Sequence, residues 1–201
     1  KVKQDPLERL LANPRVRMEV KKILKREYTP EEPAYSAFVD HSNAVAELAC
    51  RIAERVGGRT AFVLEAAWLH DVGIRYTRAP GIGCQGEEPY LKHGIIGREL
   101  CEREGLVEHG LVCERHVGTG LTAREIKEQN LPLPCREMLC QTLEERIICY
   151  ADQFFSKSTP DTLTVEEVRR RVKRHGEAPL RRFEEMHREF GLAAGSARES
   201  A

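Results

Sequence analysis

Six side chains with metal-binding chemistry occupy positions where a polar residue is costly. Each lies on or beside an apolar stripe of helical spacing, close to a predicted helix end. His70 and Asp71 end the most apolar segment of the chain, and burying them there is unfavourable unless something pairs with them. Helices of a bundle can bring such groups to one point. The candidate ligands are His41, His70, Asp71, His93, His116 and Asp152.

These ligand types suit a particular kind of metal centre. Imidazole and carboxylate ligands without thiolate favour Fe, Mn, Zn, Ni or Co. Six ligands are too many for one ion that keeps an open position, but they suit two ions that share a carboxylate. Asp71 is the natural bridge, because His70 precedes it and the chain turns away at Gly73. Two divalent transition metal ions about 3.5–4 Å apart can hold a bridging hydroxide and clamp a phosphate.

The other histidines and the cysteines suggest no second site. His109, His175 and His187 have charged or loop-like neighbours, which is typical of surface or satisfied core residues. The seven cysteines include no CxxC pair, which argues against a disulfide scaffold and against a thiolate zinc site. We therefore expect reduced thiols and a cytoplasmic protein.

The elements that must position the six ligands are predicted to be helices throughout. Apolar residues recur at helical spacing in one segment after another, and no convincing strand alternation occurs. The predicted helices cover about 16–24, 36–56, 60–70, 90–104, 107–116, 122–129, 143–155, 165–174 and 178–190. The fold class is therefore all-α.

Chain length and the positions of helix-breaking glycines and prolines predict one domain with additions at both ends. The 201 residues divide into an N-terminal helical extension (1–33), a central domain (34–160), C-terminal helices packed on the same domain (161–190) and a disordered tail (191–201). The Gly- and Pro-rich loop 77–89 and the turn 118–120 are expected to form walls of a substrate pocket, since glycine lets the backbone approach a phosphate closely.

Charge and hydropathy restrict the partners. The chain has 32 Lys and Arg against 32 Asp and Glu, so its net charge is zero. Strong attraction to nucleic acid or to an anionic membrane is not expected at that balance, and no apolar run approaches a membrane span. Arginines at 169–174 are interleaved with glutamates, as on a solvated helix face. The expected partner is a small phosphorylated substrate, with neither membrane nor nucleic acid involved.

The ordered ligand set resembles a known family. His41, then His70-Asp71, then Asp152 is similar to the H…HD…D signature of the HD superfamily of metal-dependent phosphohydrolases, and Leu69-His70-Asp71-Val72-Gly73 resembles its HDIG variant. The stretches 115–122 and 143–152 look like a small, largely uncharacterised prokaryotic branch, and the resemblance covers about 36–157. It implies a compact helical bundle of the HD-domain type with a central dinuclear site. The first metal would be held by His41, His70, Asp71 and Asp152, with His93 and His116 completing the second.

The resemblance also implies a reaction. A metal-bound hydroxide would attack a phosphate ester, a monoester or a diester, in a nucleotide or other small phosphorylated metabolite, and Asp71 would orient that nucleophile. The chain departs from many HDIG proteins at Ile74, where they carry a lysine that serves the substrate phosphate or the catalytic network. Arg75 and Lys92 are candidates to replace that lysine, against the simpler interpretation that they are surface cations.

Two alternatives share the same ligands. Some two-metal HD proteins are di-iron oxygenases, and a degenerate HD module could bind a nucleotide without catalysis. Metal identity and a requirement for O2 separate the oxygenase from the hydrolase, while nucleotide binding without turnover would identify the non-catalytic module.

Overall fold

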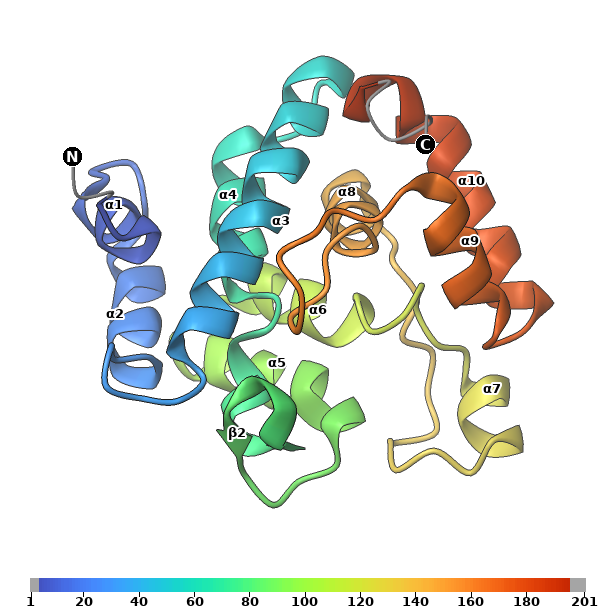
Figure 1. Ribbon diagram of the computed structural model, residues 1–201, viewed down its shortest axis with the longest axis horizontal. Helices are drawn as coiled ribbons and strands as arrows, with labels where there is room; N and C mark the ends of the chain where they lie inside the picture. The colour runs from blue at the N-terminus through green and yellow to red at the C-terminus, as the bar shows by residue number, and fades with distance from the viewer. Residues whose placement is uncertain (1–3, 196–201) are drawn as a thin grey trace.

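The computed structural model describes residues 4–195, and helices dominate this part of the chain, as the sequence predicts (Figure 1). The α-helices are α1 (Pro6–Ala12), α2 (Met18–Glu27), α3 (Tyr35–Val56), α4 (Thr60–Leu69), α5 (His93–Arg103), α6 (Val107–Arg115), α7 (Ala123–Glu128), α8 (Leu143–Asp152), α9 (Val165–Lys173) and α10 (Glu177–Ala194). Short 3-10 helices are η1 (Val72–Tyr76), η2 (Pro80–Ile82) and η3 (Tyr90–Lys92). The prediction of an all-α protein is confirmed.

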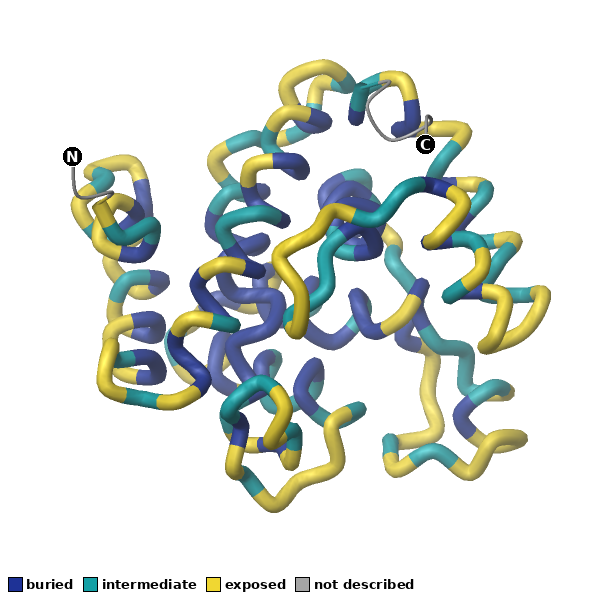
Figure 2. The backbone as a smooth tube through the Cα atoms, viewed as in Figure 1, coloured by how far each residue is buried: buried dark blue, intermediate teal, exposed yellow. Residues whose placement is uncertain are grey.

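The centre of the molecule is built around α3 and α4. Helix α3 packs against α4, α8 and α10, while α4 also contacts α6 and α8. Helix α4 is apolar nearly all round, and Val63, Ala66, Ala67 and Leu69 are fully buried. A helix of this composition is stable only when other helices surround it. Figure 2 shows the buried positions gathered in this central region and the exposed ones on the outer helix faces and loops.

Helix boundaries follow local capping chemistry. Thr122 and Thr164 cap α7 and α9 with capping boxes, in which Glu125 and Glu167 bond back to the cap residue. The chain leaves α3 at Gly57, whose φ of 80° places it in the left-handed region that glycine adopts easily. Such caps determine at which residue a helix begins or ends, and therefore where the side chains at that end lie.

The Gly- and Pro-rich loop 77–89 contains a small two-stranded sheet. Strands β1 (Arg78–Ala79) and β2 (Cys84–Gln85) pair antiparallel, with Arg78 opposite Gln85. The sequence shows no convincing strand alternation here, and it does not predict this short pair. Two-residue strands are too short to show an alternating pattern, and the turn between them depends on Gly83, which has a φ of 80°.

Gly73 allows η1 and α5 to approach unusually closely. A Cβ atom at this position would overlap the carbonyl oxygen of His93 and would lie 2.8 Å from the backbone nitrogen of Gly97. The absence of a side chain therefore lets α5 lie directly against the segment that follows Asp71. This contact brings the first residue of α5, His93, next to the end of α4.

Both ends of the described chain pack onto the central helices. Helix α2 contacts α4, α5 and η1, and α10 contacts α3, α8 and α9. Helix α10 continues to Ala194, so residues 191–194 are helical where a disordered tail is expected. Phe190, Gly191 and Ala194 are buried there, and this packing extends the helix. The rest of the expected tail, 196–201, lies outside the described residues.

In residues 4–195, no helix has the combination of length and apolar character that crossing a membrane would require.

Candidate metal centre

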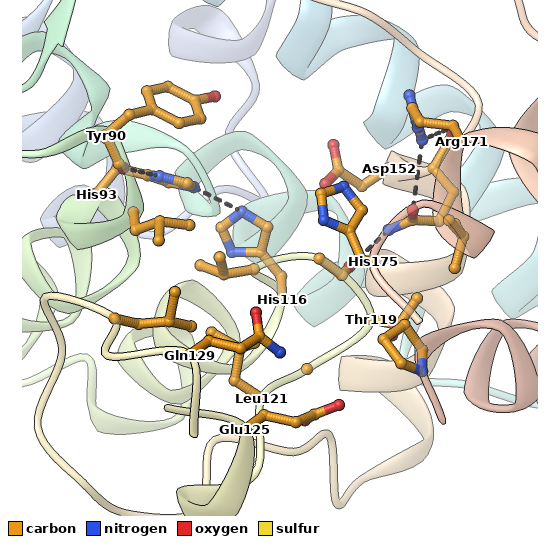
Figure 3. Close-up of a pocket in the computed structure, with 18 of the residues that line it drawn as sticks. Tyr90, His93, His116, Thr119, Leu121, Glu125, Gln129, Asp152, Arg171 and His175 are labelled. Atoms are coloured by element: carbon orange, nitrogen blue, oxygen red, sulfur yellow. Dashed lines mark hydrogen bonds between the residues drawn. The ribbon is translucent and has the colours of Figure 1, made fainter. Parts of the chain in front are cut away.

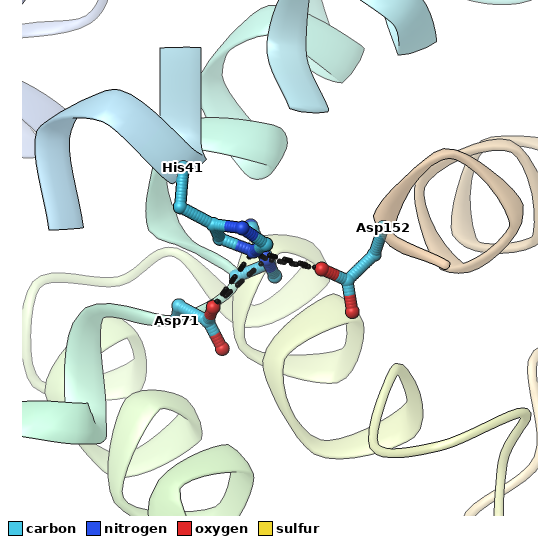
Figure 4. Close-up of side chains that lie close together, drawn as sticks. His41, Asp71 and Asp152 are labelled. Atoms are coloured by element: carbon cyan, nitrogen blue, oxygen red, sulfur yellow. Dashed lines mark hydrogen bonds and ion pairs between the residues drawn. The ribbon is translucent and has the colours of Figure 1, made fainter. Parts of the chain in front are cut away.

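A first cluster gathers four side chains carried by α3, by the end of α8 and by the two residues after α4; Figure 4 shows His41, Asp71 and Asp152 pointing toward one another. His41 belongs to α3, His70 and Asp71 directly follow α4, and Asp152 is the last residue of α8. His41 Nε2 lies 2.8 Å from Asp152 Oδ1 and 3.2 Å from Asp71 Oδ2. His70 Nε2 lies 3.2 Å from the same Asp71 oxygen and 3.3 Å from Asp152 Oδ1. One atom of each residue lies within 4.8 Å of the others, so together they could hold one metal ion.

A second cluster uses the other oxygen of Asp71. His93 Nε2 lies 3.3 Å and His116 Nε2 lies 3.2 Å from Asp71 Oδ1. The two imidazole nitrogens are 3.2 Å apart. His93 begins α5, and His116 follows the last residue of α6. The Asp71 carboxylate therefore presents Oδ2 to the first cluster and Oδ1 to the second, which is how a bridging carboxylate is arranged.

Backbone carbonyl groups fix the orientation of three of the rings. The Nδ1 atoms of His70, His93 and His116 lie 2.5, 2.6 and 2.7 Å from the carbonyl oxygens three residues earlier. A carbonyl can only accept, so each Nδ1 donates its proton. In the neutral form that binds a metal ion, each ring would direct its Nε2 lone pair into the centre, which is the arrangement common among metal-binding histidines.

Burial and opposite charges act together on the pKa values in this centre. Burial alone lowers the pKa of His70, but the carboxylates of Asp71 and Asp152 raise it to about 10. Burial alone would raise the pKa values of the same two carboxyl groups, but nearby cations and imidazole donors together hold them well below their usual range; the largest of these opposing effects is the positive charge of His70. Burial lowers the pKa of His116. The centre thus holds two ionised carboxylates that attract cations.

The centre fits a divalent metal ion. Asp71 Oδ2 is fully buried, and no donor among residues 4–195 has hydrogen-bond geometry to it, although three nitrogens lie within 3.2 Å. His41 and His70 bring their Nε2 atoms within 3.3 Å of each other. Closely facing imidazole nitrogens and an unsatisfied carboxylate oxygen are costly in a buried site, and a bound cation would satisfy all of them.

A lysine outside the expected ligand set reaches the same centre. Lys157 lies in the segment after α8, and its Nζ is 2.8 Å from Asp71 Oδ2. Its ammonium also lies over the ring of Tyr90, 5.8 Å from the ring centre. The carboxylates of Asp71 and Asp152 raise the pKa of Lys157 against the effect of its burial. The sequence analysis missed this residue, because an irregular segment gives no periodicity that would show where its side chain points.

A cavity of about 570 Å³ opens beside the metal centre (Figure 3). His93, His116 and Asp152 line it together with Lys157. The rest of its wall comes mainly from Tyr90, Leu91, 117–121, Glu125, Gln129, Leu131, Gln153, Phe155, Arg171, Val172, His175 and Pro179. The turn 118–120 lines this cavity, as expected, but no residue of loop 77–89 does. That loop is held by hydrogen bonds to its own neighbours, including Arg78 N to the Glu88 carbonyl.

Arg75 and Lys92, the two cations considered for substrate binding, are engaged elsewhere. Arg75 donates to the backbone carbonyl of Glu27 and lies 3.3 Å from Glu32. Lys92 Nζ lies 2.8 Å from Glu88. Neither residue belongs to the wall of the cavity beside the metal centre. Both lie close to the ligands in sequence, but local carboxylates direct their side chains away.

Comparison with known proteins points to one family. The HD domain family matches residues 38–156, more than half of the chain. The tRNA (cytidine(56)-2′-O)-methyltransferase of Thermoplasma volcanium is 27% identical over 159 residues, which are 78% of this chain and 43% of that protein. An uncharacterised protein of Methanocaldococcus jannaschii is 34% identical over 120 residues, 57% of this chain and 63% of that protein. The chain thus spans less than two thirds of the length of each of these relatives.

A solved structure has a similar fold. The HD domain of the L. monocytogenes phosphodiesterase PgpH, crystallised in complex with cyclic-di-AMP, superposes with a TM-score of 0.50 at 18% identity. The match covers 94% of this chain and 91% of that one. With the family match over residues 38–156 and this shared helical architecture, the chain belongs to the HD domain family.

Proposed function

We propose that this protein is a metal-dependent hydrolase that acts on a phosphate ester in a nucleotide or a similar small phosphorylated molecule. The observation that carries the proposal is the Asp71 carboxylate, whose two oxygens face two separate groups of imidazoles. Such an arrangement suits two ions that share one carboxylate, and paired ions of this kind are typical of phosphoryl-transfer sites. The adjoining cavity would receive the substrate.

Each ligand has a defined task in this proposal. One ion would be held by His41, His70, Asp71 and Asp152, and the other by Asp71, His93 and His116. When bound, the ions supply a nucleophile from water near neutral pH and neutralise charge on the phosphoryl oxygens. Asp71 keeps the two positions in register and orients the nucleophile. The backbone carbonyls behind His70, His93 and His116 hold these rings in place.

Lys157 is the residue of this chain best placed to contact the phosphoryl group. Its Nζ lies at the boundary between the metal centre and the cavity, beside Asp71 and Tyr90. A metal ion at the first cluster would replace the ammonium as the partner of Asp71 Oδ2, which would free Lys157 to donate to a phosphoryl oxygen. We therefore assign to Lys157 the role for which Arg75 and Lys92 were considered.

The character of the cavity supports a nucleotide as the substrate. Tyr90, Leu121, Phe155 and Val172 provide apolar walls, and a volume of about 570 Å³ is within the range of small-molecule sites. One of the relatives is named as an enzyme that methylates a cytidine in tRNA, and the structural neighbour was crystallised in complex with cyclic-di-AMP. Both names concern nucleotides, which supports the same substrate class for this chain.

The test begins with the metal. Elemental analysis of the purified protein would be followed by assays with p-nitrophenyl phosphate, bis-p-nitrophenyl phosphate and AMP in the presence of Mn, Fe, Co, Ni or Mg. We expect hydrolysis of one bond type, in air and under anaerobic conditions alike, and loss of activity on chelation. Turnover that requires O2 and iron would indicate an oxygenase. Tight AMP binding without turnover by metal-loaded protein would indicate a non-catalytic nucleotide-binding module.

A further inference from the structure

A second cation faces the cavity from a helix outside the span that the family matches. Arg171 belongs to α9, and its side chain lines the cavity together with Asp152 and Lys157. In Figure 3, Arg171 lies on the same side of the cavity as Asp152, whereas His93 lies across from them. The C-terminal helices therefore contribute a guanidinium to the wall of the pocket that the metal centre borders.

Neutral acceptors hold the guanidinium of Arg171. Its Nη2 donates to the backbone carbonyl of Gln153 and lies 3.3 Å from the Oε1 of that residue, and both acceptors are neutral. Among the described residues no carboxylate forms an ion pair with it. Arg169, two residues earlier, shows the contrast, since it pairs with Glu166 and Glu184. Burial lowers the pKa of Arg171, and the carboxylate of Asp152, which forms no ion pair with it, only partly offsets that effect.

The orientation of this guanidinium is fixed by a buried partner. Gln153 is 5% exposed, and its Nε2 donates to the carbonyl of Gly118 at 2.7 Å and to that of Cys149 at 3.2 Å. The amide oxygen of Gln153 is therefore directed towards Arg171. A guanidinium offers five N–H donors in a rigid fork, and within residues 4–195 only Nη2 of Arg171 donates to an acceptor. The remaining donors are available to a ligand in the cavity.

We propose that Arg171 binds a second anionic group of the substrate, so that the substrate carries one phosphate at the metal centre and another at Arg171. The fitting chemical class is a nucleoside with two phosphate groups or a dinucleotide, whose nucleoside part would lie along the apolar wall. This inference rests on the proposed function for the group at the metal centre. The fork geometry of arginine is suited to a phosphate, which it can contact with two parallel bonds.

The experiment compares probes with one and two phosphate groups. Isothermal titration of the Mn-loaded protein would measure binding of AMP, ADP and adenosine 3′,5′-bisphosphate. We expect at least one of the two-phosphate probes to bind more tightly than AMP. In Arg171→Gln we expect that advantage to fall by about 10-fold or more, the effect of losing charge-assisted hydrogen bonds. Arg170→Gln, an exposed neighbour on the same helix, should bind all three probes as the wild type does.

The outcomes separate this inference from the proposed function. Equal weakening of one- and two-phosphate probes in Arg171→Gln would mean that the residue only supports the wall, and it would overturn the inference. So would two-phosphate probes that bind the wild type no better than AMP. If Arg171→Gln removes the preference but the wild type hydrolyses none of the phosphate esters, the inference stands and the proposed hydrolase activity fails. A wild-type Tm and metal content would show that the variant is folded.

Discussion

Asp71 is the residue on which both clusters depend. Its Oδ2 lies 3.2 Å from His70 and its Oδ1 lies 3.2 Å from His116. Replacing it with asparagine keeps the shape but removes the negative charge, and leaves one oxygen where there were two. We expect Asp71→Asn to lose metal from both positions, so that elemental analysis gives less than one ion per chain.

The matched control for this variant is Asp161→Asn. Asp161 is exposed and lies beyond the segment that carries Lys157. This variant should retain the metal content of the wild type. Full occupancy in Asp71→Asn, measured on protein loaded in the same way, would contradict the bridging role.

Lys157 should affect metal binding and turnover in opposite directions. Its ammonium is 2.8 Å from Asp71 Oδ2 and would compete there with a metal ion. In Lys157→Met we expect tighter metal binding, because the competing charge is gone. We expect kcat/KM for a phosphate ester to fall about 10- to 100-fold, since a charge-assisted contact to the phosphoryl group is lost. Metal titration and steady-state kinetics would measure the two effects.

Lys173→Met provides the control for the lysine experiment, because Lys173 is exposed at the end of α9. It should leave both quantities unchanged. A parallel loss of metal and activity in Lys157→Met would show instead that the lysine supports the structure of the centre.

The difference between Lys157 and the ligands shows what a sequence can predict at the scale of residues. His41 and Asp152 stand out because each interrupts an apolar stripe on a helix, and the structure does bring them together. Lys157 follows α8 in an irregular segment, so nothing in the pattern gives its direction. Arg75 is close to the ligands in sequence, but carboxylates of the N-terminal segment bind it. Adjacency in sequence therefore does not determine which cation reaches the site.

At the scale of elements, the contact between η1 and α5 links Gly73 to the second cluster. A Cβ at Gly73 would overlap the backbone of α5 at His93, and backbone cannot move aside as a flexible side chain can. We expect Gly73→Ala to shift α5, to lower the free energy of unfolding by about 1–3 kcal/mol and to reduce the metal content from two ions towards one. Urea unfolding and elemental analysis would measure these changes.

Gly81→Ala is the matched control for Gly73→Ala. Gly81 lies in η2, a few residues after η1, and an added Cβ there would meet no atom within 4 Å. It should change neither stability nor metal content. Two bound ions and unchanged stability in Gly73→Ala would show that the close approach of α5 is not needed to place His93.

The helices could be predicted more completely than the cavity they surround. Helical spacing of apolar residues is a local signal, and the centre of α3, all of α4 and most of α8 follow it. Of the two expected walls, the turn 118–120 lines the cavity but loop 77–89 does not, and residues of α7, α9 and α10 contribute to the wall as well. Contacts between segments so far apart in the chain depend on how helices pack, which local periodicity does not specify.

At the scale of the whole molecule, the candidate ligands join five helices. They come from α3, the ends of α4, α6 and α8, and the start of α5. Without a cation, two ionised carboxylates lie in one cluster, and the positive charges of His70 and Lys157 attract them. A bound ion would replace weak and imperfect contacts among separate helices with direct bonds. Metal binding should therefore stabilise the entire fold.

The stabilisation expected from metal binding can be estimated. A ligand that binds only the folded state, at a free concentration of 100 times its Kd, adds about 2.7 kcal/mol. For a domain of about 200 residues, each kcal/mol raises Tm by about 2–4 °C. We therefore expect Mn to raise the Tm of the chelator-treated wild type by about 5–10 °C. Asp71→Asn should show little of this shift, because the folded form no longer offers a shared carboxylate. An equal shift in both proteins would mean that the metal stabilises the molecule elsewhere than at the centre built around Asp71.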